Sequence, residues 1–129
     1  MSSQKKAQQK SLSEEDLNAL IIDSIQDIKG KNIIKLDLRN LDDRPTDFFI
    51  ICQGESSTQV KSIAQNVQFR LKDELGVVPV SSEGVSGAKW VLVDYFNVIV
   101  HVFYPETREF YDLEDLWSDS EITSYEDID

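Results

Sequence analysis

The sequence predicts a single domain of the α/β or α+β class, in which helices pack on a mixed sheet of about five strands. Two segments carry apolar residues at helical spacing, whereas several shorter segments alternate or are uniformly apolar, as in strands. The predicted order is helix, two strands, helix, three strands and a short helix. A chain of 129 residues is long enough to bury one core without disulfides.

The first helix is predicted to begin after Ser13, which forms a pattern like a capping box with Asp16. Gly30 is placed to end this helix. Its buried stripe consists of apolar residues three or four positions apart, namely Leu17, Leu20, Ile21, Ile25 and Ile28. Residues 32–38 then alternate between apolar and polar side chains, which predicts a half-exposed strand. Residues 48–52 are five apolar residues in succession, which predicts a strand covered on both faces.

The second helix is predicted between a cap at Ser56 or Ser57 and a terminating Gly76. Residues 77–80 predict a short strand, which Pro79 restricts to a sheet edge or a strand end. A strand, helix and strand over 48–80 predict a right-handed crossover between two parallel neighbours. The stripe of this helix is Val60, Ile63, Ala64, Val67, Leu71 and Leu75.

Residues 90–93 and 98–103 predict two strands, joined as a hairpin through residues 94–97. Leu113, Leu116 and Trp117 predict a short terminal helix that folds back on the sheet. Beyond this domain, which spans residues 13–117, both ends have too little apolar content to pack. We therefore expect a flexible N-terminal tail over 1–12 and an acidic, solvated C-terminal tail over 118–129.

Charge and cysteine content restrict the partners. The 13 basic and 24 acidic residues give a net charge of −11, which disfavours contact with RNA phosphates and favours basic protein partners. Cys52 is the single cysteine, so an intramolecular disulfide or a cysteine zinc site is not expected. No apolar run is long enough to span a bilayer and no secretory signal is present, so we expect a cytoplasmic protein without membrane contact.

Three segments, taken in order together with the first helix, cover about residues 13–117 and form a specific pattern. The first is Asp47-Phe-Phe-Ile-Ile-Cys-Gln-Gly54, followed by Ser56 and Gln59-Val60. The second is Glu83-Gly84, Trp90-Val-Leu-Val-Asp94-Tyr95 and Val98-Ile-Val-His101-Val-Phe103. The third is Arg108-Glu-Phe-Tyr111-Asp-Leu113-Glu114-Asp-Leu116-Trp117. Together with the first helix, these three segments resemble the signatures of the ribosome silencing factor family (Iojap-related). Two positions depart, because the family's Gly-Asp hairpin turn is Phe96-Asn97 here.

The resemblance implies a fold similar to nucleotidyltransferases and a function without catalysis. Members bind ribosomal protein L fourteen on the large subunit and sterically prevent the small subunit from joining, which represses translation. Relatives in organelles take part in large-subunit assembly, so an assembly role at the same docking surface stays open. Whether the free protein forms a homodimer also stays open.

The predicted docking residues are aromatic, apolar and charged side chains of the hairpin and of the segment after it. Trp90, Leu92 and Asp94 share one strand face, so an acidic group flanks an apolar patch that a basic partner can cover. The full set is Trp90, Leu92, Asp94, Tyr95, His101, Phe103, Arg108 and Tyr111. The alternative for each aromatic residue is a place in the core, and for Arg108 and Tyr111 it is anchoring of the terminal helix.

Two rival functions follow from the residues. A nucleotide-binding enzyme is suggested by Gly54 and Ser56, which resemble a phosphate-binding turn, but the paired carboxylates that would hold Mg²⁺ are missing from the strands. Cys52 and His101 are candidates for a nucleophile and its base only if the fold brings them together. A general acidic adaptor without a ribosomal target is the second rival. We expect no catalytic residues, no cofactor and no metal.

Overall fold

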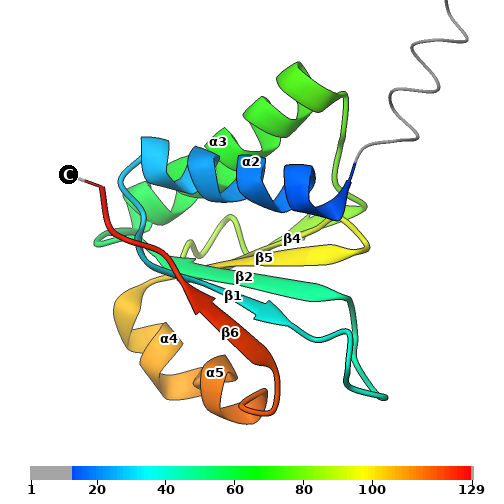
Figure 1. Cartoon of the computed structure of the whole chain (residues 1–129). Helices are drawn as coiled ribbons and strands as arrows, with labels where there is room; N and C mark the ends of the chain where they lie inside the picture. Colours follow the sequence, from blue (N-terminus) through cyan, green and yellow to red (C-terminus); the bar gives the residue numbers. More distant parts are fainter. Residues whose placement is uncertain (1–12, 129) are drawn as a thin grey trace, which may run out of the picture.

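The computed structural model describes residues 13–128, and the predicted N-terminal tail over 1–12 lies outside the described residues. The chain forms a six-stranded sheet with helices on both sides (Figure 1). The helices are α2 (Glu14–Asp27), α3 (Ser57–Leu75), α4 (Pro105–Tyr111) and α5 (Leu113–Leu116). The strands are β1 (Lys31–Asp37), β2 (Phe48–Gln53), β3 (Ser81–Glu83), β4 (Trp90–Asp94), β5 (Val98–Phe103) and β6 (Glu121–Ser124).

The predicted fold class is confirmed. The strand order is β3-β4-β5-β2-β1-β6, with β2 and β5 parallel and the other described neighbours antiparallel. β2 lies next to the centre of the sheet and is buried on both faces, as its unbroken apolar sequence predicted. β4 and β5 form the predicted hairpin, with Trp90 opposite Phe103 and Leu92 opposite His101.

The two long helices begin and end close to the residues that the sequence indicated. Ser13 caps α2 by accepting a hydrogen bond from the backbone N–H of Asp16, at 3.0 Å. Ser56 does the same for α3 through the N–H of Gln59, at 3.1 Å, and α3 ends at Gly76 in the left-handed conformation. The apolar stripes of both helices face the sheet, where they pack against strand residues.

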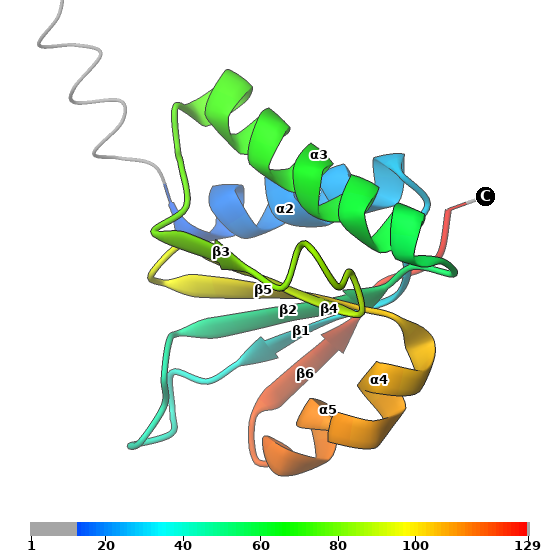
Figure 2. The same cartoon turned by 180° about the vertical axis from the view of Figure 1, so that it is seen from behind.

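The sheet separates two hydrophobic clusters. α2 and α3 cover one face, where their stripes pack against Phe48, Ile50, Cys52 and the inward residues of β4 and β5. The other face carries a smaller cluster built around Phe49, Phe103 and Leu113. Among the helices of residues 13–128, α4 and α5 are the ones on that second face, and they lie toward one end of it (Figure 2). The second face is therefore less completely covered than the first.

Two predictions about the middle of the chain were wrong in detail. Residues 77–80 are not a strand; the strand is β3, at Ser81–Glu83, where backbone pairing with β4 holds residues of low strand propensity. The strand that lies parallel and adjacent to β2 is β5, because β3 takes the sheet edge beyond β4. Pro79 precedes the strand, in keeping with its missing backbone N–H.

The prediction of a solvated C-terminal tail over 118–129 was also wrong for part of that segment. Residues 121–124 form β6, which pairs antiparallel with β1, and Tyr125 packs against the larger cluster. The N–H of Tyr125 also donates to the carbonyl of Ile33, at 2.9 Å. All four residues of β6 are exposed, so backbone hydrogen bonds hold this strand in place more than side-chain burial does.

The terminal helical region comprises two short helices, of which the sequence indicated only the second. Pro105 begins α4, where its fixed φ and missing N–H are tolerated. Asp112 separates α4 from α5 and caps the latter. Leu113 and Trp117 pack on the second sheet face, as the predicted fold-back requires.

Candidate functional site

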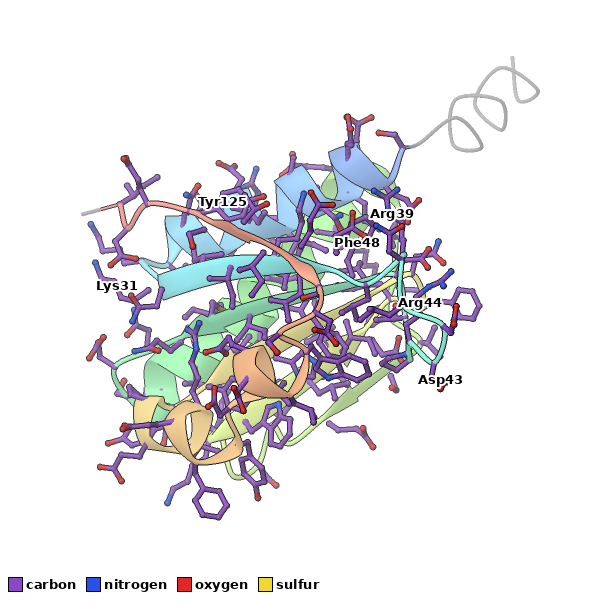
Figure 3. The ribbon with its side chains drawn as sticks, turned by 60° about the horizontal axis from the view of Figure 1, so that its bottom comes forward. Lys31, Arg39, Asp43, Arg44, Phe48 and Tyr125 are labelled. Carbon is purple, nitrogen blue, oxygen red and sulfur yellow. The ribbon has the colours of Figure 1, made fainter. Side chains whose placement is uncertain are left out.

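The second sheet face carries a half-covered apolar strip that we call the Trp90 face, formed by Trp90, Leu92, Asp94 and Ile99. Trp90, Leu92 and Asp94 alternate with the buried Val91 and Val93, so they share one side of β4. Figure 3 views this side of the molecule, with α4 and α5 in front of one part and the loop that carries Asp43 and Arg44 at the opposite end. The strip extends between those two features, because Trp90 contacts Tyr111 of α4 and Asp94 lines a cavity together with Arg44.

Trp90 is held in a defined orientation by rings on three sides. It stacks on Phe103 with centroids 4.8 Å apart and contacts Tyr111 of α4 at 4.7 Å. Its indole Nε1–H donates to Nδ1 of His101, at 3.1 Å. A half-buried tryptophan with its polar atom paired presents its remaining surface as apolar area.

The start of β4 approaches the preceding loop closely. Gly84 adopts a φ of +85°, and a Cβ there would collide with the carbonyl oxygen of Trp90. Glycine is therefore required at this position, both for its backbone conformation and for the space. This contact fixes the backbone that carries the indole.

The hairpin end of the Trp90 face is acidic. A cavity of about 430 Å³ lies there between the hairpin turn and the loop before β2. Three carboxylates and one arginine are among the residues that line it. The full lining is Asp42, Arg44, Pro45, Thr46, Asp47, Asp94, Phe96 and Asn97. Asp94 also stabilises the turn, because its Oδ1 accepts the N–H of Phe96 at 2.7 Å.

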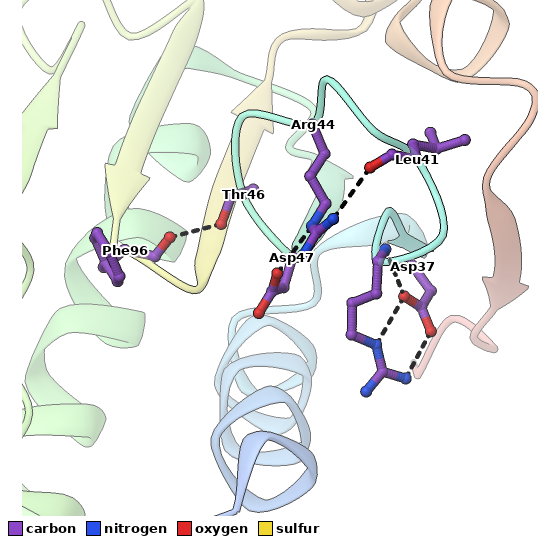
Figure 4. Close-up of polar contacts among 7 residues, drawn as sticks. Asp37, Leu41, Arg44, Thr46, Asp47 and Phe96 are labelled. Atoms are coloured by element: carbon purple, nitrogen blue, oxygen red, sulfur yellow. Dashed lines mark hydrogen bonds and ion pairs between the residues drawn. The ribbon is translucent and has the colours of Figure 1, made fainter.

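The loop before β2 is held in place by an ion pair and side-chain hydrogen bonds (Figure 4). Arg44 pairs with Asp47 at 3.1 Å and also donates to the carbonyl of Leu41. Thr46 donates to the carbonyl of Phe96 at 2.6 Å, which ties the loop to the hairpin turn. The two segments that line the acidic cavity are thus connected directly.

A second ion pair lies beside this loop. Asp37 receives two hydrogen bonds from the Arg39 side chain, at 3.0 and 2.8 Å. These bonds are the largest cause holding the pKa of Asp37 below its usual value. The Arg39 guanidinium also lies 4.8 Å from the ring centroid of Phe48, as a cation–π contact.

The other end of the Trp90 face is aromatic. A cavity of about 520 Å³ lies between the start of β4 and α4, lined by Lys89, Trp90, Glu106, Thr107, Phe110 and Tyr111. Phe110 is 79% exposed and Tyr111 51%, and their rings contact edge to face at 5.0 Å. Two neighbouring aromatic side chains exposed to this extent are a feature of protein interfaces rather than of isolated surfaces.

Arg108 anchors α4 beneath these aromatic residues. Its Nη1 donates to the carbonyl of Asn32 at 2.7 Å and to Oε1 of Gln53 at 3.1 Å. It also pairs with Glu114 at 3.4 Å. With 8% of its surface exposed, Arg108 holds α4 against β1 and β2 and offers little area to a partner.

The structure divides the eight predicted docking residues into two groups. Trp90, Leu92, Asp94 and Tyr111 have accessible surface on or beside the Trp90 face. The buried group is Tyr95, His101, Phe103 and Arg108. Tyr95 belongs to the cluster under α2 and α3, where burial raises the pKa of its hydroxyl. Phe103 is completely buried and contributes by stacking beneath Trp90.

Sequence reasoning missed two exposed aromatic residues near this face. Phe96 is 75% exposed and has a φ of +75°, a conformation that glycine favours. The sequence showed that Phe96 replaces the usual turn residue. The exposure of its side chain could not be predicted, because it depends on the conformation of the turn. Phe110 was overlooked because no helix was predicted for the segment that contains it.

The residues that suggested an enzyme have structural roles. A Cβ at Gly54 would lie 2.9 Å from the backbone nitrogen of Val60, so glycine permits the close approach of β2 and α3. Ser56 is the α3 cap. Over residues 13–128, no group of three or more His, Cys, Asp or Glu side chains is placed to hold a metal ion.

Cys52 and His101 do not form a catalytic pair. Cys52 pairs with Val102 in the sheet and faces the cluster under the long helices, whereas His101 packs against Phe49 on the other face. Burial raises the pKa of the Cys52 thiol to about 12. The thiol is therefore protonated and inert, as a small apolar side chain would be.

Within the described part of the chain, no helix combines the length and apolar character needed to cross a membrane.

Comparisons with known proteins identify the family. A family model described as "Ribosomal silencing factor during starvation" matches residues 10–129. A relative from Chromobacterium violaceum named ribosomal silencing factor RsfS is 45% identical over 106 residues, which are 80% of this chain and 83% of the relative. One of the same name from Halalkalibacterium halodurans is 33% identical, over 91% of this chain and 98% of the relative.

The solved structures agree with the sequence comparisons. A crystal structure of a Chromobacterium violaceum protein has a TM-score of 0.79 and 42% identity, and the match covers 83% of this chain and 88% of that one. The sequence resemblance noted above is thereby confirmed. The chain belongs to the family of ribosomal silencing factors.

Proposed function

We propose that this protein binds ribosomal protein L fourteen on the large ribosomal subunit, through the Trp90 face, and sterically blocks joining of the small subunit. Translation is thereby repressed without any bond being made or broken. The observation that carries the proposal is the incomplete cover of the second sheet face, which leaves Trp90, Leu92 and Ile99 half-buried beside exposed Tyr111. Family membership supplies the ribosome as the target.

The size and chemistry of this face suit a specific protein partner. A standard interface buries roughly 1,200–2,000 Å² in total, which a domain of this size can supply. An aromatic residue near the centre with a polar rim is the usual arrangement of residues that dominate binding energy. Trp90 lines the aromatic cavity together with Phe110 and Tyr111, and Asp94 lines the acidic cavity at the opposite end of β4.

Charge favours a protein contact over an RNA contact. The chain carries a net charge of −11, and the acidic cavity contributes Asp42, Asp47 and Asp94 at the rim of the face. RNA phosphates are repelled by such a surface, whereas arginine and lysine side chains of a ribosomal protein are attracted. The docked protein therefore makes little direct contact with ribosomal RNA.

The test is a sucrose-gradient profile of purified ribosomal subunits, with and without an excess of this protein. We expect it to migrate with the large subunit and to reduce the peak of joined ribosomes. Adding it after joining should have a smaller effect, because the blocked surface is then already occupied. Normal joining in the presence of saturating bound protein would contradict steric exclusion.

A second measurement assigns the partner. Isolated ribosomal protein L fourteen should bind this chain, and Trp90→Ala should weaken that binding. Migration with the large subunit without binding to L fourteen would contradict the partner while leaving the ribosomal function intact. Accumulation of incomplete large subunits in depleted cells, with normal subunit joining in the gradient, would favour assembly instead.

A further inference from the structure

The contact between Trp90 and His101 crosses the hairpin diagonally. Trp90 lies opposite Phe103 and His101 lies opposite Leu92, so the two rings belong to neighbouring positions on the same sheet face. The indole Nε1–H donates to Nδ1 of His101 at 3.1 Å. The ring of Phe49 holds the imidazole from the adjacent strand, edge to face at 4.6 Å.

The contact requires a neutral imidazole in one tautomer. Nδ1 can accept a hydrogen bond only when it carries no proton, so the proton of the neutral ring is on Nε2. His101 is 4% exposed, and this burial lowers its pKa to about 4. The rings packed around it, those of Phe49, Trp90 and Phe103, carry no charge that would favour the imidazolium.

The second nitrogen of His101 distinguishes it from an ordinary core residue. Nε2 is buried and has no hydrogen-bond partner among the described residues. A buried donor without a partner is unfavourable, and an apolar ring of similar shape would fill the same space without that penalty. Fold stability alone therefore does not account for histidine here, whereas the acceptor that it offers to Trp90 does.

The indole would gain other orientations without that acceptor. Trp90 is only half-buried, so a rotated indole could donate to water instead. Such rotation would turn a polar edge outward and disturb the stack on Phe103. A partner that covers the ring would first have to restore its orientation, which weakens binding.

We propose that His101 is a positioning residue of the Trp90 face: by accepting the indole N–H it fixes the orientation in which Trp90 docks, and it makes no contact with the ribosome itself. This inference rests on the proposed function. It assigns to His101 a role different from the direct contact that the sequence suggested.

Two substitutions separate the acceptor from the ring. His101→Phe keeps an aromatic ring against Phe49 but removes the acceptor, and it also removes the unpaired Nε2–H. His101→Asn loses the ring but can place its amide oxygen near the position of Nδ1. We expect His101→Phe to fold at least as stably as the unmodified protein and to bind large subunits about tenfold more weakly. His101→Asn should recover much of the binding.

A double-substitution cycle and a spectroscopic readout test the mechanism. In a Trp90→Phe background, His101→Phe should weaken binding no further, because no indole N–H remains to be positioned. In the full chain, the ¹H–¹⁵N signal that Trp90→Phe removes should be protected from solvent exchange. His101→Phe should shift that signal and accelerate its exchange.

The outcomes are distinguishable. The inference would be overturned if His101→Phe weakened binding equally in both backgrounds. It would also be overturned if His101→Phe weakened binding in neither background while the unmodified protein binds. Both outcomes would leave the proposed function standing. Absence of binding by the unmodified protein would overturn both. An unchanged indole signal in His101→Phe would overturn the positioning role by itself.

Discussion

The guanidinium of Arg108 donates a hydrogen bond of 2.7 Å to the carbonyl of Asn32, so that α4 is anchored at the start of β1. Arg108→Ala should lower the free energy of unfolding by about 2 kcal/mol, because the backbone carbonyl of Asn32 and the side chain of Gln53 lose a charged donor. Arg108→Lys should recover part of the loss, since lysine keeps the charge without the planar fork. Urea denaturation measures the difference, and an unchanged midpoint for Arg108→Ala would contradict the anchoring role.

Trp90 is expected to dominate docking. Trp90→Ala should weaken binding to the large subunit by about 2 kcal/mol, close to thirtyfold. Phe69→Ala is a matched control, because Phe69 is a highly exposed aromatic residue on α3, on the other side of the sheet. Sedimentation with large subunits measures both. Equal effects of the two substitutions would remove Trp90 from the interface.

Opposite charge should accelerate the encounter with the ribosome. Raising the salt concentration from low to physiological should slow association roughly tenfold, because screening weakens long-range attraction to a basic partner. Asp94→Asn should lower the low-salt association rate by about two- to threefold while its side-chain oxygen still accepts the N–H of Phe96. Asp73→Asn, with the same charge change on α3, should have a smaller effect. Stopped-flow association measures the rates, and a salt-independent rate would contradict steering.

The buried His101 predicts a pH dependence of stability. Burial lowers its pKa from 6.5 in the unfolded chain to about 4 in the folded protein, so the unfolded state binds more protons between those values. The stability that depends on the neutral ring is fully present above pH 6.5 and is lost as the pH falls toward 4. The loss amounts to about 3 kcal/mol by linkage. In urea melts at pH 7 and pH 4.5, His101→Phe should lose less stability than the unmodified protein, and parallel losses would contradict this assignment.

Local patterns predicted the central elements of the fold because side-chain burial determines those elements. The uniform apolar run of β2, the helix stripes and the caps at Ser13 and Ser56 all correspond to what the structure contains. The strands at the sheet edges were predicted less well. β3 and β6 consist of exposed residues, and backbone pairing with a distant neighbour determines where they lie. A single sequence gives little sign of such pairing.

The composition of the Trp90 face was predicted in part. Alternation correctly placed Trp90, Leu92 and Asp94 together on one side of β4. The predicted set also included His101 and Phe103, but strand alternation could not show that Phe49 and Trp90 cover their rings. The exposure of Phe110 depends on α4, which was not predicted. This helix is short, begins at Pro105 soon after β5, and has little apolar periodicity in its sequence. Burial on a shared face depends on neighbours in space, which strand periodicity does not specify.

The pairing of β6 with β1 has a consequence for folding during synthesis. β1 emerges early, yet the strand that closes its outer edge is made only after five other strands of the sheet. Until then the outer backbone groups of β1 are open to pairing with other chains, which is a known route to aggregation. A nascent chain arrested before residue 121 would carry this open edge. Pairing of β6 with β1 therefore protects the completed chain from intermolecular strand pairing.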